Sequence, residues 1–167
     1  MITGIDILRS VVEATNEVLS DANRSDITFF SGYTSTVTNE MTNLMRGNYS
    51  DPFPVFCVFT EDMKETTNGN LLQVEIKKVV IACRAIPNLT EAQRLASSFD
   101  NILHPIYKEF CAQMAKLFPY TKQWSHTRAD VPLYAEAKKT SNPMNAIVDA
   151  VVIRNLKFNF YKSKCND

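Results

Sequence analysis

The sequence has little glycine, little proline and no long apolar run. Its 167 residues include four glycines and seven prolines, which excludes collagen-like and low-complexity chains. No stretch of about 18 apolar residues occurs, so the sequence predicts no transmembrane span. The first residues, MITGIDILRSVVEATNEVL, carry early acidic side chains and no basic leader, so we also expect no signal peptide.

The chain also lacks an excess of charge of either sign. It has 18 basic and 18 acidic side chains, and 45% of its residues are hydrophobic. This composition is typical of a globular protein and excludes disorder caused by charge excess. A net charge of zero argues against a dedicated nucleic-acid binder, although it leaves a local basic patch open.

Metal-binding and redox motifs are missing as well. No two of the four cysteines form a CxxC pair, which leaves a zinc ribbon or a thioredoxin motif unsupported. Three of them lie within apolar runs and are expected to be small buried hydrophobes, with free thiols as the default: Cys57, Cys83 and Cys111; the fourth is Cys165. We therefore expect no metal and no cofactor.

The residues that acid–base or nucleophilic catalysis needs are sparse. The two histidines are His104, before a proline on an expected helix, and His126, in a polar segment. Ser125, His126 and Asp130 lie close in sequence, but no GxSxG elbow accompanies them, so we assign them no catalytic role. No Walker loop, GxGxxG or DxD nuclease pattern occurs, and the nearest approach to an acidic cluster is Glu40, Glu61, Asp62 and Glu65. We therefore expect that the protein is not an enzyme.

The first third of the chain alternates between helical and extended patterns. Apolar residues recur at helical spacing from Ile5 to Leu19, and Thr3 with Asp6 matches a capping box. A short strand is expected at 27–30, and a helix of weak propensity at 35–47.

Two strands joined by a polar segment come next. PFPVFCVF, residues 52–59, is an apolar run that suits a buried strand, and its prolines place it at a strand start or on an edge. Residues 61–70 are polar and predict a mobile connection with a turn at Asn68–Gly69. Residues 71–85 predict a long strand, antiparallel to the first. Apolar and polar residues alternate in it until Lys78, and the residues that follow are continuously apolar. This change indicates a bulge or a part of the strand that is covered on both faces.

The longest helical pattern follows, from Thr90 to Phe118. Asn88 and Glu91 match a capping-box spacing, and Pro105 predicts that this helix is kinked or divided in two. Residues 120–145 are expected to form a long loop with one short strand at 124–131.

A closing strand at 146–162 completes the predicted fold. The order of elements predicts one α+β domain over residues 1–167. We expect two layers, a mainly antiparallel sheet packed by the N-terminal helix and by the long helix.

In the order of its elements and in the character of their sequences, the chain resembles the tail-terminator, or tail-completion, proteins of long-tailed bacteriophages. The segments that carry this resemblance are FFSGYTSTVTNEMTNLM, DPFPVFCVFTEDMKE, LLQVEIKKVVIACRA, the helix at 90–118 and VVIRNLKFNFYK. The resemblance implies a structural protein of the virion, assembled in the bacterial cytoplasm. It would form a homo-oligomeric ring, commonly a hexamer, that caps the tail tube, faces the head connector and surrounds a lumen through which DNA passes.

A ring of this kind needs two different, complementary patches on each subunit. Two exposed segments of mixed charge are the candidate contacts. The first is the polar hairpin at 61–70 and the second the loop at 124–139, with the candidate residues Glu61, Asp62, Lys64, Glu65, Trp124, Arg128, Lys138 and Lys139. The basic residues of the loop either face the lumen or are simply solvated: Lys122, Arg128, Lys138 and Lys139. Strand addition at the edge of PFPVFCVF is another route of association.

Other functions remain open at this point. Another neck or connector component of a phage would share this kind of domain. An adaptor module with no link to phages would use the sheet edge to bind a partner. An enzyme is the third class, although the scattered acidic residues do not define a pocket.

Overall fold

The computed structural model describes residues 1–20, 24–46, 51–120, 122–134 and 148–162. Its main helices are α1 (Gly4–Leu19), α2 (Thr34–Arg46) and a long helix made of α3 (Glu91–Arg94), η2 (Leu95–Leu103) and α4 (His104–Leu117). The strands are β1 (Thr28–Gly32), β2 (Val55–Phe59), β3 (Met63–Asn68), β4 (Leu71–Arg84), β5 (Trp124–Val131) and β6 (Val148–Tyr161), with a short 3-10 helix η1 (Thr60–Asp62) between β2 and β3. No helix in these ranges is long and apolar enough to span a membrane.

The six strands form one mixed sheet in the order β1-β2-β4-β6-β5. Only β1 and β2 run parallel; the other pairs are antiparallel. The central pair, β4 with β6, is matched from Leu71–Tyr161 to Arg84–Val148. Strand β3 pairs with the first half of β4, while β2 pairs with its second half. The prediction of an α+β fold with a mainly antiparallel sheet is therefore confirmed.

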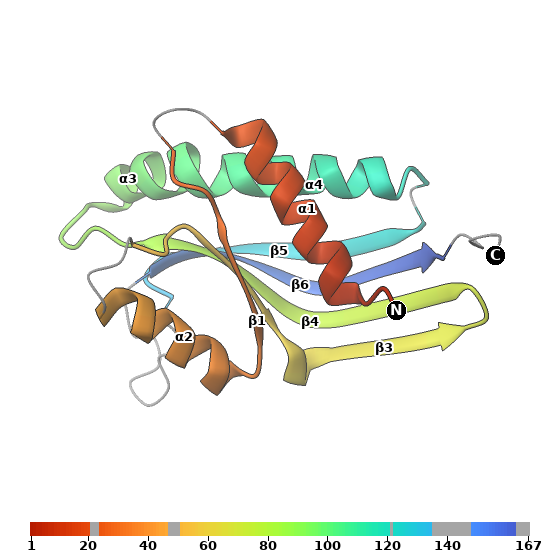
Figure 1. Cartoon of the computed structure of the whole chain (residues 1–167). Helices are drawn as coiled ribbons and strands as arrows, with labels where there is room; N and C mark the ends of the chain where they lie inside the picture. Colours follow the sequence, from red (N-terminus) through yellow and green to blue (C-terminus); the bar gives the residue numbers. More distant parts are fainter. Residues whose placement is uncertain (21–23, 47–50, 121, 135–147, 163–167) are drawn as a thin grey trace.

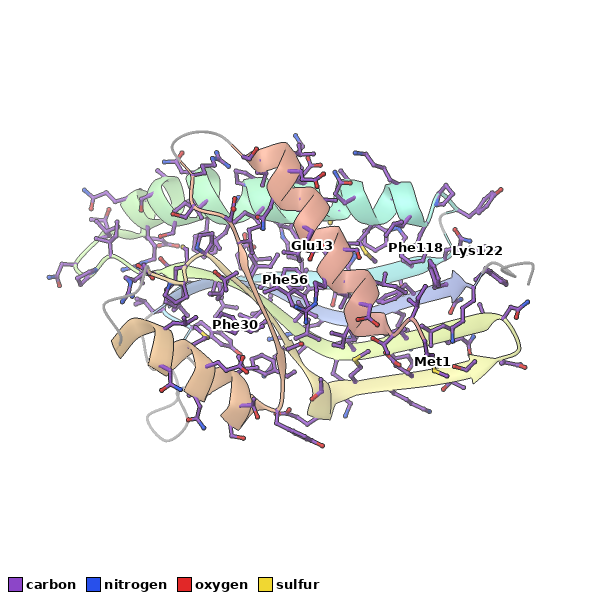
Figure 2. All side chains as sticks on the ribbon, viewed as in Figure 1. Met1, Glu13, Phe30, Phe56, Phe118 and Lys122 are labelled. Carbon is purple, nitrogen blue, oxygen red and sulfur yellow. The ribbon has the colours of Figure 1, made fainter. Side chains whose placement is uncertain are left out.

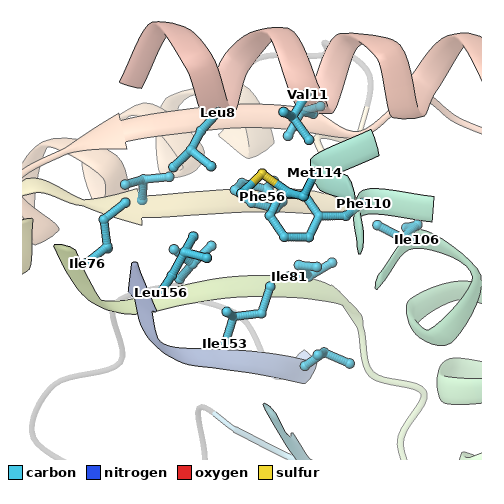
Figure 3. Packing of buried hydrophobic residues seen from close by; sticks show 14 of the residues in the cluster. Leu8, Val11, Phe56, Ile76, Ile81, Ile106, Phe110, Met114, Ile153 and Leu156 are labelled. Carbon is cyan, nitrogen blue, oxygen red and sulfur yellow. The ribbon is translucent and has the colours of Figure 1, made fainter. Parts of the chain in front are cut away.

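Helices α1 and η2–α4 lie on the same face of the sheet (Figure 1). Their apolar stripes meet the inward side chains of β2, β4 and β6 in the larger core cluster (Figure 3). At its centre the ring of Phe110 lies 5.2 Å from that of Phe56, and both side chains are 1% exposed. The expected capping box of α1 is present, since Thr3 and Asp6 exchange their side-chain and backbone hydrogen bonds.

Among the described helices, α2 packs on the opposite face of the sheet, at one end. Val37 and Met41 of this helix are fully buried against a second cluster that includes Val80 and Val152. That end of the molecule is therefore three layers deep, one more than the sequence predicted. It explains why β4 becomes continuously apolar after Lys78, because from there both faces of the strand are buried.

The switch between the two halves of β4 and β6 is a local irregularity. Matched pairing is interrupted between Ile76–Leu156 and Lys78–Arg154. Asn155 has a left-handed φ of 51° at this place. The alternation of inward side chains changes phase there in both strands. The change in the pattern of β4 after Lys78 thus reflects both predicted alternatives, a bulge-like irregularity and burial of both faces.

Two predictions for the middle of the chain are wrong. Strand β2 lies between β1 and β4, so PFPVFCVF is not an edge, and strand addition there is blocked by β1. Its prolines are accommodated because the strand begins at Val55, after both of them. The segment at 61–70 is not a loose connection either, because it forms η1 and strand β3, which Gly69 (φ 58°) and Asn70 turn into β4.

The long helix begins differently from the prediction and is continuous through Pro105. Its capping box is formed by Thr90 and Gln93, because Asn88 adopts a left-handed φ of 61° outside the helix. Pro105 does not divide the helix. The preceding segment η2 is a π-helix, in which the wider turn leaves room for a proline that has no N–H to donate.

A buried ion pair joins the long helix to the closing strand. Arg94 Nη1 lies 3.1 Å from Asp149 Oδ2, and Asp149 is fully buried. Asp149 Oδ1 also accepts a 3.0 Å hydrogen bond from the backbone N–H of Leu133. One carboxylate thus connects α3, at the start of the long helix, with β6 and the chain after β5.

Candidate functional site

The predicted contact residues are divided between two opposite edges of the sheet. Glu61, Asp62, Lys64 and Glu65 lie in η1 and β3, on the outer side of β4. Trp124 and Arg128 lie in β5, the last strand at the other edge. The side chain of Asp62, and all of Lys138 and Lys139, fall outside the described part of the chain.

The carboxylate of Glu61 holds the start of helix α2. Its two oxygens accept hydrogen bonds from the backbone N–H of Thr34 at 3.1 Å, and one of them also accepts a hydrogen bond from the Thr34 hydroxyl. Partial burial raises the pKa of Glu61, but the bonds from Thr34 outweigh it and hold the pKa below its usual value. Glu61 is therefore an exposed anion bound at a helix N-terminus of its own subunit, where the helix dipole favours it.

Glu65 does the same for helix α1. Its Oε1 accepts a 2.6 Å hydrogen bond from the backbone N–H of Gly4, the first residue of that helix. Lys64, which precedes Glu65 on β3, points to the opposite face of the sheet and is exposed. Glu61, Lys64 and Glu65 are all exposed, but Glu61 and Glu65 each also bind the N-terminus of a helix of the same subunit.

On β5, Trp124, His126, Arg128 and Asp130 alternate along the strand and face the long helix. The rings of Trp124 and His126 stack at 5.0 Å, and the guanidinium of Arg128 lies 4.7 Å above the ring of Tyr107. Arg128 Nε is also 3.4 Å from Asp130 Oδ1. Trp124 and Arg128 thus contact other side chains of the same subunit, and Arg128 helps to hold the edge strand against α4.

The helix contributes a matching row of polar side chains. His104 Nε2 lies 2.7 Å from Asp130 Oδ2, and its Nδ1 lies 3.3 Å from Asp100 Oδ1. Further along, the hydroxyl of Tyr107 is 2.6 Å from His126 Nε2. Both histidines therefore lie at the seam between α4 and β5, and Ser125 points to the other face of the sheet, in register with Lys157.

The protonation of this seam is unlike that of an activated catalytic site. Burial raises the pKa of Tyr107 to about 12 and also raises the pKa of the Cys111 thiol. Burial, followed by the charge of Arg128, lowers the pKa of His126. All three groups are held neutral near pH 7, while an activated thiol needs a lowered pKa. The arrangement suits packing and hydrogen bonding.

Sequence patterns could have revealed this seam. The four β5 residues recur with a period of two, which places them on one face of a strand. The helix residues Asp100, His104, Tyr107 and Cys111 recur at i, i+4, i+7 and i+11, which places them on one face of a helix. Joining the two rows requires knowledge that β5 lies beneath α4, and that depends on long-range pairing with β6.

A cavity of about 310 Å³ lies at the end of α1, near Cys83 and Arg84. Arg84 is bound there by Asp51 at 3.0 Å and stacks over the ring of Phe53. Burial raises the pKa of the Cys83 thiol to about 11. Within the described ranges, no three His, Cys, Asp or Glu side chains come together in a way that would hold a metal ion.

The strand edges themselves are the features with the clearest capacity for association, and β1, at the end of the sheet order, is an outer strand as well. In the described part of the chain, neither the outer side of β3 nor that of β5 is paired with another strand. Unpaired strand edges present rows of backbone donors and acceptors that another chain can satisfy. No protein-family model matches the chain, and no curated protein matches it.

Proposed function

We propose that this chain is a structural tail protein of a long-tailed phage or prophage, which assembles head to tail into a ring that closes the tail tube at the head–tail junction. The observation that carries the proposal is the order of its elements. The chain has an N-terminal helix, a strand that ends at an aromatic–glycine segment, a strand after prolines, a long strand, a long helix and a closing strand, in the same order as the tail-terminator proteins that the sequence resembles. Helix α2 and strands β3 and β5 lie between them.

The two unlike sheet edges support the ring. A cyclic assembly needs two different surfaces on each subunit, and β3 and β5 are different strands at opposite edges. Successive antiparallel pairing through β4 and β6 leaves β3 and β5 running in opposite directions. A rotation about an axis parallel to the strands preserves those directions, so β5 of one copy would meet β3 of the next copy as an antiparallel pair.

Electron microscopy of the purified protein, alone and mixed with tail tubes, tests the proposal. We expect rings in solution or at tube ends. Protein that shows no ring in either sample and stays monomeric at high concentration would refute it.

A pair of variants tests which surface makes the contact. Thr66→Lys/Thr67→Lys adds two charges to exposed positions of the β3 edge, and charges on an edge strand oppose strand addition. Ala112→Lys/Ala115→Lys adds the same two charges to exposed positions of α4 as a matched control. We expect the first variant to remain monomeric and the control to form rings. Normal rings from the β3 variant would exclude this edge as the contact.

A further inference from the structure

One half of the sheet has a face that no described helix covers. This open face, as we call it, is the side opposite α1 and α4 and is formed by β3, the first half of β4, the second half of β6 and the start of β5. Most of its side chains are polar or charged: Lys64, Thr66, Gln73, Glu75, Lys78, Ser125, Thr127, Arg154, Lys157 and Asn159. Leu71 and the exposed Tyr161, which are paired with each other, lie at its far end.

Register places the charges of the open face in two adjoining rows. One row runs Lys64, Glu75, Lys157 and Ser125 across four strands, and the next runs Lys78, Arg154 and Thr127. Lys157 Nζ lies 3.4 Å from Glu75 Oε1, so that pair is partly neutralised. Lys122 borders the same surface, since it lines a shallow hollow together with Gln73, Glu75, Lys157 and Asn159.

The open face therefore carries more cations than anions. Its anions are Glu75 and, at the border, Glu61. Its cations are Lys64, Lys78, Lys122, Arg154 and Lys157. The whole chain has equal numbers of the two signs, so this excess is local. Lys64 and Lys157 lie two strands apart, about 10 Å, which is within about one Debye length at 0.1 M salt. Their fields consequently add.

The remaining side chains indicate which polyanion fits. Thr66, Gln73, Ser125 and Asn159 offer hydroxyl and amide donors of the kind that contact phosphate oxygens. The two charged rows contain no aromatic side chain on which single-stranded bases could stack, and Tyr161, an exposed aromatic residue of this face, lies beyond them at the end of β6. This combination favours contact with the phosphate backbone of a duplex.

We propose that the open face binds the backbone of duplex DNA without reading its sequence. The choice of DNA as the duplex rests on the proposed function, in which DNA passes through the ring. The contact itself depends only on the charges and donors of one subunit. Arg128 takes no part, because it faces α4 on the other side of the sheet.

Salt dependence of binding gives the sharpest expectation. If about four phosphates are neutralised, the slope of log K against log salt is about −3.6, and raising salt from about 50 to about 200 mM weakens binding about 150-fold. Removing two of the cations lowers the slope to about −1.8, which corresponds to a loss of about 12-fold over the same range.

Fluorescence anisotropy with a labelled 20-base-pair duplex tests the proposal. The variant Lys64→Gln/Lys157→Gln removes two open-face cations, and Lys108→Gln/Lys116→Gln removes two exposed lysines of α4 as the matched control. We expect weaker binding and the smaller salt slope for the first variant only. Thermal melts of both variants confirm that each is folded.

Two outcomes would overturn the proposal. One is no binding by the wild-type protein at about 100 μM and about 50 mM salt, where non-specific contacts of this size are measurable. The other is an equal salt slope for the open-face variant and the α4 control. Ring formation, measured separately by microscopy, distinguishes a failure of this inference from a failure of the proposed assembly.

Discussion

The buried ion pair between Arg94 and Asp149 makes the clearest prediction about stability. Asp149→Asn keeps the size of the side chain and an acceptor for the Leu133 N–H, but it leaves the guanidinium of Arg94 without its counter-charge. The side chains of Arg94 and Asp149 are 9% and 0% exposed, so water cannot replace the lost partner. Breaking a buried pair in this way costs about 3–5 kcal/mol.

For a chain of this length, each kcal/mol shifts the melting temperature by about 2–4 °C, so we expect a loss of about 6–20 °C. The matched control is Asp51→Asn, which breaks the pair with Arg84, where both side chains are about half exposed. An exposed pair contributes about 0–1 kcal/mol, so the control should lose less than about 4 °C. Calorimetry or circular dichroism measures both.

Replacing the buried cation as well provides a second check. Arg94→Met in the Asp149→Asn background removes the uncompensated charge, and we expect it to recover part of the lost stability. Equal effects of Asp149→Asn and Asp51→Asn, or no recovery in the double variant, would refute the reasoning that burial gives this pair its weight.

Three further predictions concern the core, a cap and a histidine. Phe110→Ala should cost about 3–5 kcal/mol in urea unfolding, because the ring is 1% exposed, while Leu117→Ala, at 47% exposed, should stay within about 0.5 kcal/mol. Thr90→Ala should cost about 1 kcal/mol, since it removes the N-cap of the long helix, and an unchanged unfolding midpoint would contradict that role. The pKa of His126, followed by NMR titration, should lie below the usual 6.5, because burial and Arg128 disfavour its charge. Unfolded His126 then takes up its proton at higher pH than the folded residue, so stability falls as the pH drops below about 6.5, and His126→Phe should reduce that loss.

Local patterns predicted most elements because each pattern depends on neighbouring residues. The capping box at Thr3, the strand at 124–131 and the change in β4 after Lys78 were all visible in the sequence and are present in the structure. The apolar run at 52–59 was correctly expected to be a buried strand, and of the two places predicted for its prolines, a strand start or an edge, the strand start is correct. Its place inside the sheet was missed, because the position of β1 beside it is a long-range feature.

The roles of the candidate site residues were harder to predict for the same reason. Glu61 and Glu65 lie in a polar stretch that suggested an exposed loop, yet each binds the N-terminus of a helix 27 or 61 residues away. His104 meets Asp130 only because β5 is paired beneath the long helix. The charges of the open face lie on three strands and at Lys122 before β5, and only the register of the sheet gathers them.

Solution mass by light scattering, over a concentration series at low and moderate salt, tests the proposed ring most directly. We predict a mass that rises with concentration and then stops at one closed assembly, six times the mass of the chain if the ring is a hexamer. A mass of one chain over the whole range, or one that grows without reaching a plateau, would contradict the ring.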